Sequence, residues 1–137
     1  MRVLGLDHGT ERHGVALSDD LGMIAQPLEF IPNQPTTGIW KRLKEIHQNS
    51  PFELIVIGMP RNMDGSYGPA SEKVNQFIEQ LKLEIDTPIK TWDERLSSAQ
   101  ANRVLLQANV SRKKRKGKVD KMAAAIILQS YLDSVQM

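Results

Sequence analysis

The chain has 137 residues and a mass of 15.4 kDa, with 40% hydrophobic and 25% charged residues. This is the size and composition of one globular domain, so we expect residues 1–137 to fold as a single domain. No apolar run approaches the roughly 20 residues that a membrane span needs. The chain has no cysteine, which excludes disulfides, thiolate metal sites and cysteine nucleophiles. These features predict a soluble protein that is not exported.

The net charge of +2 hides an uneven distribution. Residues 111–121 hold seven basic side chains and one acidic side chain, whereas the rest of the chain is net negative. Such a run is typical of a solvated surface loop, of a nuclear localisation signal or of a contact with a polyanion. Composition alone leaves these three interpretations open.

The first quarter of the chain alternates short apolar runs with turn residues. Residues 2–7 and 13–18 have the length and composition of strands. Residues 23–31 form a third, in which Pro27 predicts an edge position or a bulge. Because the connections are so short, the three strands must form an antiparallel meander.

The rest of the chain alternates helical and strand patterns. Apolar residues recur there with the 3.6-residue period of helices, and two short apolar runs between them have the length of buried strands. We expect two strands, over residues 52–58 and 88–92. We expect helices around 39–47, from Pro69 to Ile85 and from Ser97 to Ala108. A final helix should follow, with an apolar face made of Val119, Met122, Ala123, Ile126 and Ile127.

This order of elements predicts an α/β fold. A three-strand antiparallel meander continued by right-handed crossovers gives a mixed five-stranded sheet, with parallel strands in its second half and helices packed on it. That is the RNase H-like architecture. The carboxyl ends of the first, fourth and fifth strands then open on one edge, where ligands usually bind in α/β sheets.

Acidic residues occur at this edge. Asp7 ends the first strand and Asp93 and Glu94 end the last. Successive side chains point to opposite faces, so at most one of Asp93 and Glu94 faces the same site as Asp7, and the pattern does not choose between them. Asp120 is expected in the first turn of the final helix, at the margin of its apolar face.

Carboxylates that converge on one point indicate a metal site. They repel one another unless a cation neutralises them. Oxygen ligands select Mg²⁺ or Mn²⁺, which polarise phosphoryl oxygens and activate water. The chemistry indicated is phosphodiester hydrolysis.

Each acidic residue also has an ordinary structural interpretation. Asp7 could form an Asx turn, and Asp120 could stabilise the helix dipole. Glu94 could be a surface charge paired with Arg95 or Arg12. The basic segment directly before Asp120 favours the catalytic interpretation.

Three further segments could bind phosphate groups. Asn62 and Ser66 lie in the loop that follows the fourth strand, and their donors could hold a phosphate; the alternative is an ordinary loop with a turn at Asp64 and Gly65. Arg12 could clamp a phosphate or be a hairpin surface charge. The basic segment supplies Arg112, Lys113, Lys114, Arg115, Lys116 and Lys118.

Four blocks of residues carry a resemblance to a known family. They are Leu6–Ala16, Gly58–Gly65, Asp93–Ser98 and Lys118–Ala124. In this order the blocks resemble the motifs of the YqgF family, bacterial RNase H-like proteins described both as Holliday junction resolvases and as pre-16S rRNA nucleases. The resemblance extends over residues 5–133.

The resemblance implies an acidic triad of Asp7, Glu94 and Asp120 that binds a divalent metal, and it selects Glu94 over Asp93. It also implies a cytoplasmic nuclease that matures the 5′ end of pre-16S ribosomal RNA, in contact with that precursor and with ribosomal particles. Branched DNA, the Holliday junction, is the alternative substrate.

Two other functions compete with a nuclease. Leu6–Thr10 also resembles the first phosphate loop of actin-like ATPases, but those proteins close two such domains over ATP and this chain offers one. A non-catalytic RNA-binding module would bind without metal dependence. The sequence leaves open the choice of RNA or branched DNA, endo- or exonucleolytic cleavage, one or two metal ions, and the oligomeric state.

Overall fold

The computed structural model describes residues 1–62, 64–97 and 113–136, and in the last range the side chains from Met122 onward. No helix among these residues has both the length and the apolar character needed to cross a membrane. In chain order the elements are β1 (Val3–Asp7), β2 (Arg12–Ser18), β3 (Ala25–Pro32), α1 (Thr36–Asn49), β4 (Leu54–Met59), α2 (Pro69–Glu84), β5 (Ile89–Asp93), the short 3₁₀ helix η1 (Glu94–Leu96) and α4 (Lys113–Val135).

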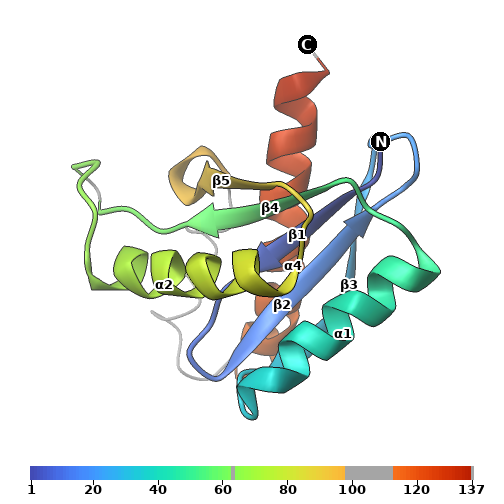
Figure 1. Ribbon diagram of the computed structural model, residues 1–137. Coiled ribbons are helices and arrows are strands. Elements are labelled where there is room, and N and C mark those ends of the chain that lie inside the picture. Colours follow the sequence, from blue (N-terminus) through green and yellow to red (C-terminus); the bar gives the residue numbers. More distant parts are fainter. Residues whose placement is uncertain (63, 98–112, 137) are drawn as a thin grey trace.

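The strands form the expected mixed five-stranded sheet, in the order β3-β2-β1-β4-β5 (Figure 1). β1 pairs antiparallel with β2, and β2 with β3, whereas β1 pairs parallel with β4, and β4 with β5. Leu6 is in register with Ile57, and Ile57 with Thr91. The carboxyl ends of β1, β4 and β5 therefore lie side by side at one edge.

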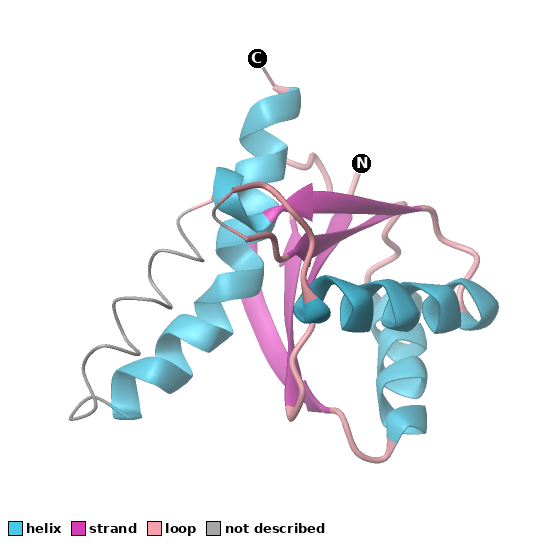
Figure 2. Ribbon diagram, turned by 90° about the vertical axis from the view of Figure 1, so that its left-hand side faces the viewer, coloured by secondary structure: helices cyan, strands magenta, loops and turns pink. Residues whose placement is uncertain are grey.

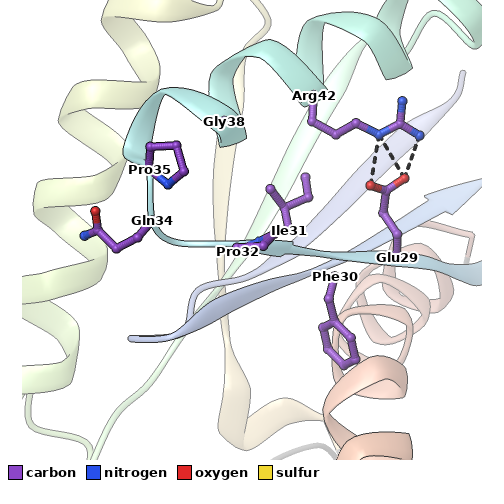
Figure 3. Close-up of a pocket in the computed structure, with 8 residues that line it drawn as sticks. All are labelled: Glu29, Phe30, Ile31, Pro32, Gln34, Pro35, Gly38 and Arg42. Carbon is purple, nitrogen blue, oxygen red and sulfur yellow. Dashed lines mark hydrogen bonds and ion pairs between the residues drawn. The ribbon is translucent and has the colours of Figure 1, made fainter.

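β3 is an edge strand, and its pairing with β2 shifts at a bulge. Val15 pairs with Glu29 but Ala16 pairs with Pro27, which confirms both expectations for this strand. Arg42 of α1 holds the Glu29 carboxylate through both oxygens, at 2.6 to 3.0 Å (Figure 3). This ion pair ties the edge strand to the first helix.

Helices cover both faces of the sheet. α1 and α2 pack on one face and α4 on the other (Figure 2). α4 lies directly on the backbone of β1, because a β-carbon at Gly5 would stand 2.8 Å from the Leu128 Cβ and 3.1 Å from the Ala124 carbonyl oxygen. The structure has one apolar core on each side of the sheet, centred on Leu4, Leu6, Ile39, Leu43, Ile55, Ile57 and Leu81, and on Val3, Val56, Ala123, Ala124, Ile127 and Leu128.

α4 differs from the expected final helix in two ways. It already includes Lys113, the first described residue of this range, so the Lys113–Lys118 segment, expected as a loop, is helical and Asp120 lies inside the helix rather than in its first turn. Lysine and arginine are good helix formers, and only Gly117 opposes the helix there. Its buried face also differs in part: Ala123 and Ile127 are buried as expected, whereas Met122 is 50% exposed and Ala124 and Leu128 are fully buried in addition.

The expected helix from Ser97 to Ala108 falls almost entirely outside the described residues. Ser97 itself is described and ends η1, where its backbone N–H and its hydroxyl both donate to the Glu94 carbonyl oxygen. The remaining expected strands and helices are confirmed, with boundaries that differ by a few residues.

Candidate active site

Asp7 occupies the buried end of β1. Asp7 is only 9% exposed. Gly5, two residues earlier and therefore on the same face, lies against Ala124 and Leu128 of α4. The Asp7 carboxylate consequently extends from the α4 face of the sheet, at the edge where three parallel strands end.

Glu94 brings a second carboxylate to the same face. It is 3% exposed and directly follows the partly buried end of β5. A β-carbon at Gly58 would stand 2.9 Å from Glu94 Oε1 and 2.6 Å from Ile127 of α4, so the Glu94 carboxylate lies over Gly58 on the α4 side. Because Leu6 pairs with Ile57, Gly58 is the position beside Asp7. The two carboxylates thus belong to neighbouring strand ends.

Asp93 is engaged differently. Arg95 donates to both of its carboxylate oxygens at 2.8 to 3.2 Å, and Arg61 donates to Oδ2 at 3.2 Å. The Arg95 hydrogen bond lowers the pKa of Asp93, and the nearby Arg61 charge lowers it further. The interpretation of Glu94 as an exposed charge is therefore wrong: Asp93 pairs with Arg95, and Glu94 is buried.

The position of Asp120 follows from the course of α4. Leu132 lies near Gly22, which packs on the backbone of Met1 before the start of β1, and Ala124 lies against Gly5. α4 therefore runs antiparallel to β1. Because Ala124 lies against Gly5, the residues of α4 that precede Ala124 lie toward Asp7, and position 120 is one of them. The Asp120 side chain lies outside the described set, and the described side chains contain no group of three metal-binding acids or histidines.

The loop after β4 is closed by its own polar groups. The backbone N–H and hydroxyl of Ser66 donate to Asp64 Oδ1 at 2.9 and 2.6 Å, and Asn62 Nδ2 donates to Ser66 Oγ at 3.0 Å. These bonds lower the pKa of Asp64, the Ser66 hydroxyl contributing most. The Asp64–Gly65 turn is present, and the Ser66 donors are directed to a carboxylate within the loop.

The basic residues of the predicted nucleic-acid contact are spread over two elements. Arg12 is exposed at the start of β2, and its guanidinium lies 4.1 Å from the centre of the Phe30 ring. Lys113, Lys114, Arg115, Lys116 and Lys118 belong to the first turns of α4, and Arg112 lies outside the described residues.

A buried histidine behind the site was not identified from the sequence. His13 is fully buried; the Gly9 N–H donates to its Nδ1 at 3.4 Å, and its Nε2 is 3.1 Å from Asn33 Oδ1. These partners fit the neutral tautomer with hydrogen on Nε2. Burial lowers the pKa of His13, and it lowers the pKa of the adjacent His8 to about 4. The alternation of β2, which points His13, Val15 and Leu17 to one side, was the available signal.

The sheet order, the helix on each face and the acidic strand ends define an RNase H-like fold. Solved structures support this class at low identity. Thermus thermophilus RuvC in complex with a Holliday junction substrate aligns with a TM-score of 0.56 and 14% identity over 99% of this chain and 96% of that chain. The fowlpox virus Holliday junction resolvase aligns with a TM-score of 0.53 and 15% identity over 98% and 99%.

Sequence relationships are much closer. The family model described as "RuvX: Holliday junction resolvase" matches residues 1–134. A protein of Halothermothrix orenii is 53% identical over 97% of this chain and 95% of its own length, and one of Desulforamulus reducens is 54% identical over 98% of each. Both carry the name "Putative pre-16S rRNA nuclease". The chain belongs to the RuvX family, a family of nucleases, as its motif blocks indicated.

Proposed function

We propose that this protein is a metal-dependent nuclease that hydrolyses phosphodiester bonds during 5′-end maturation of pre-16S ribosomal RNA. The observation that carries the proposal is the pair of buried carboxylates, Asp7 and Glu94, at neighbouring strand ends on one face of the sheet. The names of the relatives supply the substrate. Its partners would be the RNA precursor and ribosomal particles, and its location the cytoplasm.

The residues present fit a hard divalent cation. Asp7 and Glu94 offer only oxygen ligands, and burial removes the water that would otherwise screen their charge. The course of α4 makes Asp120 the third ligand in this proposal. When bound, Mg²⁺ or Mn²⁺ would polarise a phosphoryl oxygen and lower the pKa of a water molecule.

The surrounding residues position these ligands. Gly58 leaves the space that Glu94 occupies, and the arginine pair on Asp93 fixes the turn from which Glu94 starts. Arg12 and the basic turns of α4 would hold phosphate groups of the substrate. The acids therefore bind the metal in this proposal, and the basic side chains bind the strand.

Branched DNA is the second candidate substrate, because the family description names Holliday junction resolvases. Symmetric cleavage of a four-way junction favours two active sites and a dimer with a broad basic face. This chain has one basic segment and is net negative outside it. That charge distribution favours a single strand threaded past one site.

A paired assay tests the proposal. Wild-type protein and Asp7→Asn are compared on a 5′-extended 16S precursor and on a four-way junction, at equal protein, salt and Mg²⁺, with sedimentation to fix the oligomeric state. We expect metal-dependent cleavage of the RNA, reduced about a hundredfold in the folded variant. Symmetric nicking of the junction by a dimer, with the RNA untouched, would replace RNA by branched DNA. Wild-type activity of Asp7→Asn would remove the proposed metal site.

A further inference from the structure

A polar cavity lies beside the end of β1, on the face opposite α4. Its volume is about 320 Å³, which falls within the range of small-molecule sites. His8, the residue after Asp7, forms part of its wall, and Phe77 of α2 is buried at its base. The cavity therefore begins one residue from the proposed metal ligand. Its polar wall includes Thr10, Gln34, Lys73, Gln76 and Gln80.

Several polar side chains around this cavity are available to a ligand. The amides of Gln34, Gln76 and Gln80 form no hydrogen bond with any residue that the structure describes. Each amide presents both donors and an acceptor, the combination that matches the edges of nucleobases. Three such amides around one cavity can form hydrogen bonds with a flat heterocycle that has several polar atoms.

The charge of the cavity suits a phosphate group. Lys73 is exposed and forms no ion pair within the described part of the chain, and the cavity lining contains no carboxylate. A nucleotide needs both features, a cation for its phosphate and neutral polar groups for its base. An anion without a polar ring would leave the neutral polar groups unused, and a purely apolar ligand would leave the cation unused.

The aromatic wall is held rigid by stacking. The His8 ring lies 5.1 Å from Phe77, and Phe77 lies 5.4 Å from Trp40 at an interplanar angle of 23°. His8 also contacts the buried His13 ring at 5.0 Å. A base that enters the cavity would meet a fixed ring, which costs little ordering entropy.

A neighbouring cavity lacks these properties. It holds about 250 Å³ between β3 and α1, and Figure 3 shows its charged residues, Glu29 and Arg42, paired with each other. Arg42 also binds Glu45. Its cation is therefore already neutralised, whereas Lys73 is available.

We infer that the cavity between the end of β1 and α2 is a subsite for one unpaired nucleotide of the RNA substrate. The inference rests on the proposed function and extends it, because it names where the strand is held next to the acidic site. Asp7 and His8 are adjacent but extend to opposite faces, so an RNA strand that crosses the edge at β1 passes from the carboxylates to the cavity. The subsite would select single-stranded RNA, since a paired base cannot turn into it.

Binding without cleavage tests the subsite. Fluorescence anisotropy in EDTA measures the Kd of a short single-stranded RNA for wild-type protein and for Lys73→Gln/Gln76→Ala. We expect the double variant to bind about tenfold more weakly, from the loss of one phosphate contact and one base contact. The matched control, Lys41→Gln/Gln48→Ala, makes the same chemical changes at exposed positions of α1 and should keep the wild-type Kd.

Two further probes identify the ligand. With an RNA that carries an abasic nucleotide at the bound position, the difference between wild type and the double variant should shrink, because only the phosphate contact remains. Adenosine 5′-monophosphate should bind far more weakly than the RNA. If it binds as tightly as the RNA, and the double variant loses it, the cavity serves a free nucleotide and the inference is overturned.

The outcomes separate this inference from the proposed function. If wild-type protein binds and cleaves RNA while the double variant binds it equally well, the cavity is not a subsite and the nuclease assignment stands. If wild-type protein neither binds RNA in EDTA nor cleaves it in Mg²⁺, both fall. The double variant should keep the wild-type melting temperature, since both substituted residues are exposed.

A thiol tether gives an independent measurement. The chain has no cysteine, so Gln80→Cys would carry the sole thiol of the protein. An RNA with a disulfide-activated base should form a covalent complex with this variant faster than with Gln48→Cys, the exposed control on α1. Equal rates would contradict the subsite.

Discussion

The Glu94 carboxylate occupies the space that a side chain at Gly58 would take. A β-carbon at position 58 would stand 2.9 Å from Glu94 Oε1 and 3.1 Å from its Cγ. A residue of β4 without a side chain thus decides where a carboxylate from the end of β5 lies. The position of Glu94 therefore depends on the absence of a side chain at Gly58.

Gly58→Ala should lower activity by displacing Glu94. The added methyl group has no room between Glu94 and Ile127, so the carboxylate must move or the strand must shift. We expect about a hundredfold lower kcat at saturating Mg²⁺ and a free energy of unfolding lower by about 1 to 3 kcal/mol. Gly38→Ala on α1 is the control, because nothing lies within 4 Å of a β-carbon there. It should keep full activity and add about 0.5 to 1 kcal/mol of stability.

Glu94→Gln should mainly affect activity, whereas Asp93→Asn should mainly affect stability. Glu94→Gln removes a charged metal ligand, so cleavage should fall about a hundredfold while the fold persists. Asp93→Asn weakens the ion pairs with Arg61 and Arg95 instead, so it should lower the melting temperature and keep metal dependence. Cleavage rates across a Mg²⁺ titration, with thermal unfolding of both variants, check this. Wild-type cleavage by a folded Glu94→Gln variant would contradict the assignment of Glu94.

Stability should fall as the solution is acidified through the range where histidine titrates. Burial lowers the pKa of His13 below its ordinary value of 6.5, so below that pH the unfolded chain binds a proton that the folded protein excludes. The free energy of unfolding is therefore full above about pH 6.5 and decreases below it, by at most about 1.4 kcal/mol per pH unit for one proton. His8, shifted in the same direction, adds to the effect.

Urea unfolding at pH values of about 7.5, 6.5 and 5.5 measures this decrease. Asp93 does not interfere, because its pKa is lowered, so the stability that it contributes is full at these pH values and is lost only below about pH 4. His13→Gln should show a shallower decrease than the wild type. If that variant does not fold, an NMR titration of the wild-type imidazoles decides the matter. A His13 ring that titrates at 6.5 or above would contradict the prediction.

The basic turns of α4 should give RNA binding a moderate salt dependence. We expect about two or three of the five bases in Lys113–Lys118, which belong to α4, to neutralise phosphates of one strand. The logarithm of the binding constant should then fall with the logarithm of salt at a slope of about −1.4 to −2.1. Replacing Lys113, Lys114 and Arg115 by Gln should reduce the slope by about 1.

The measurement is the Kd of single-stranded RNA between about 50 and 300 mM salt, in EDTA. Replacing the exposed Lys41, Lys44 and Lys82 by Gln removes the same charge from α1 and α2 and serves as the control. A slope unchanged by the α4 substitutions would make these bases solvated charges.

The sheet could be predicted from sequence because each strand satisfies one local pattern. Pro27 is an example: its missing N–H confines it to an edge or a bulge, and β3 has both. The buried face of α4 was harder, because Ala123, Ala124 and Ala125 give a weak hydrophobic signal although all three are buried. Close packing there depends on Gly5 of a distant strand, which no local window contains.

The acidic edge could also be predicted, but the choice between adjacent acids could not. Asp93 and Glu94 both follow β5, and the resemblance to a family, not the pattern, selected Glu94. The structural reason is non-local: Arg61 from another loop binds Asp93, and the gap over Gly58 receives Glu94. The cavity beside His8 was equally hidden, because β1, α1 and α2 each contribute only part of its surroundings.

The bulge and proline of β3 also limit how copies of this protein can associate. Pro27 offers no N–H to another chain, and Leu28, the extra residue of β3 between the partners of Val15 and Ala16, interrupts the row of groups that an incoming strand would need. Strand-to-strand extension of the sheet is therefore blocked on this side. A complex that brings two acidic sites to one nucleic acid by extending the sheet would therefore have to use β5, the other edge strand.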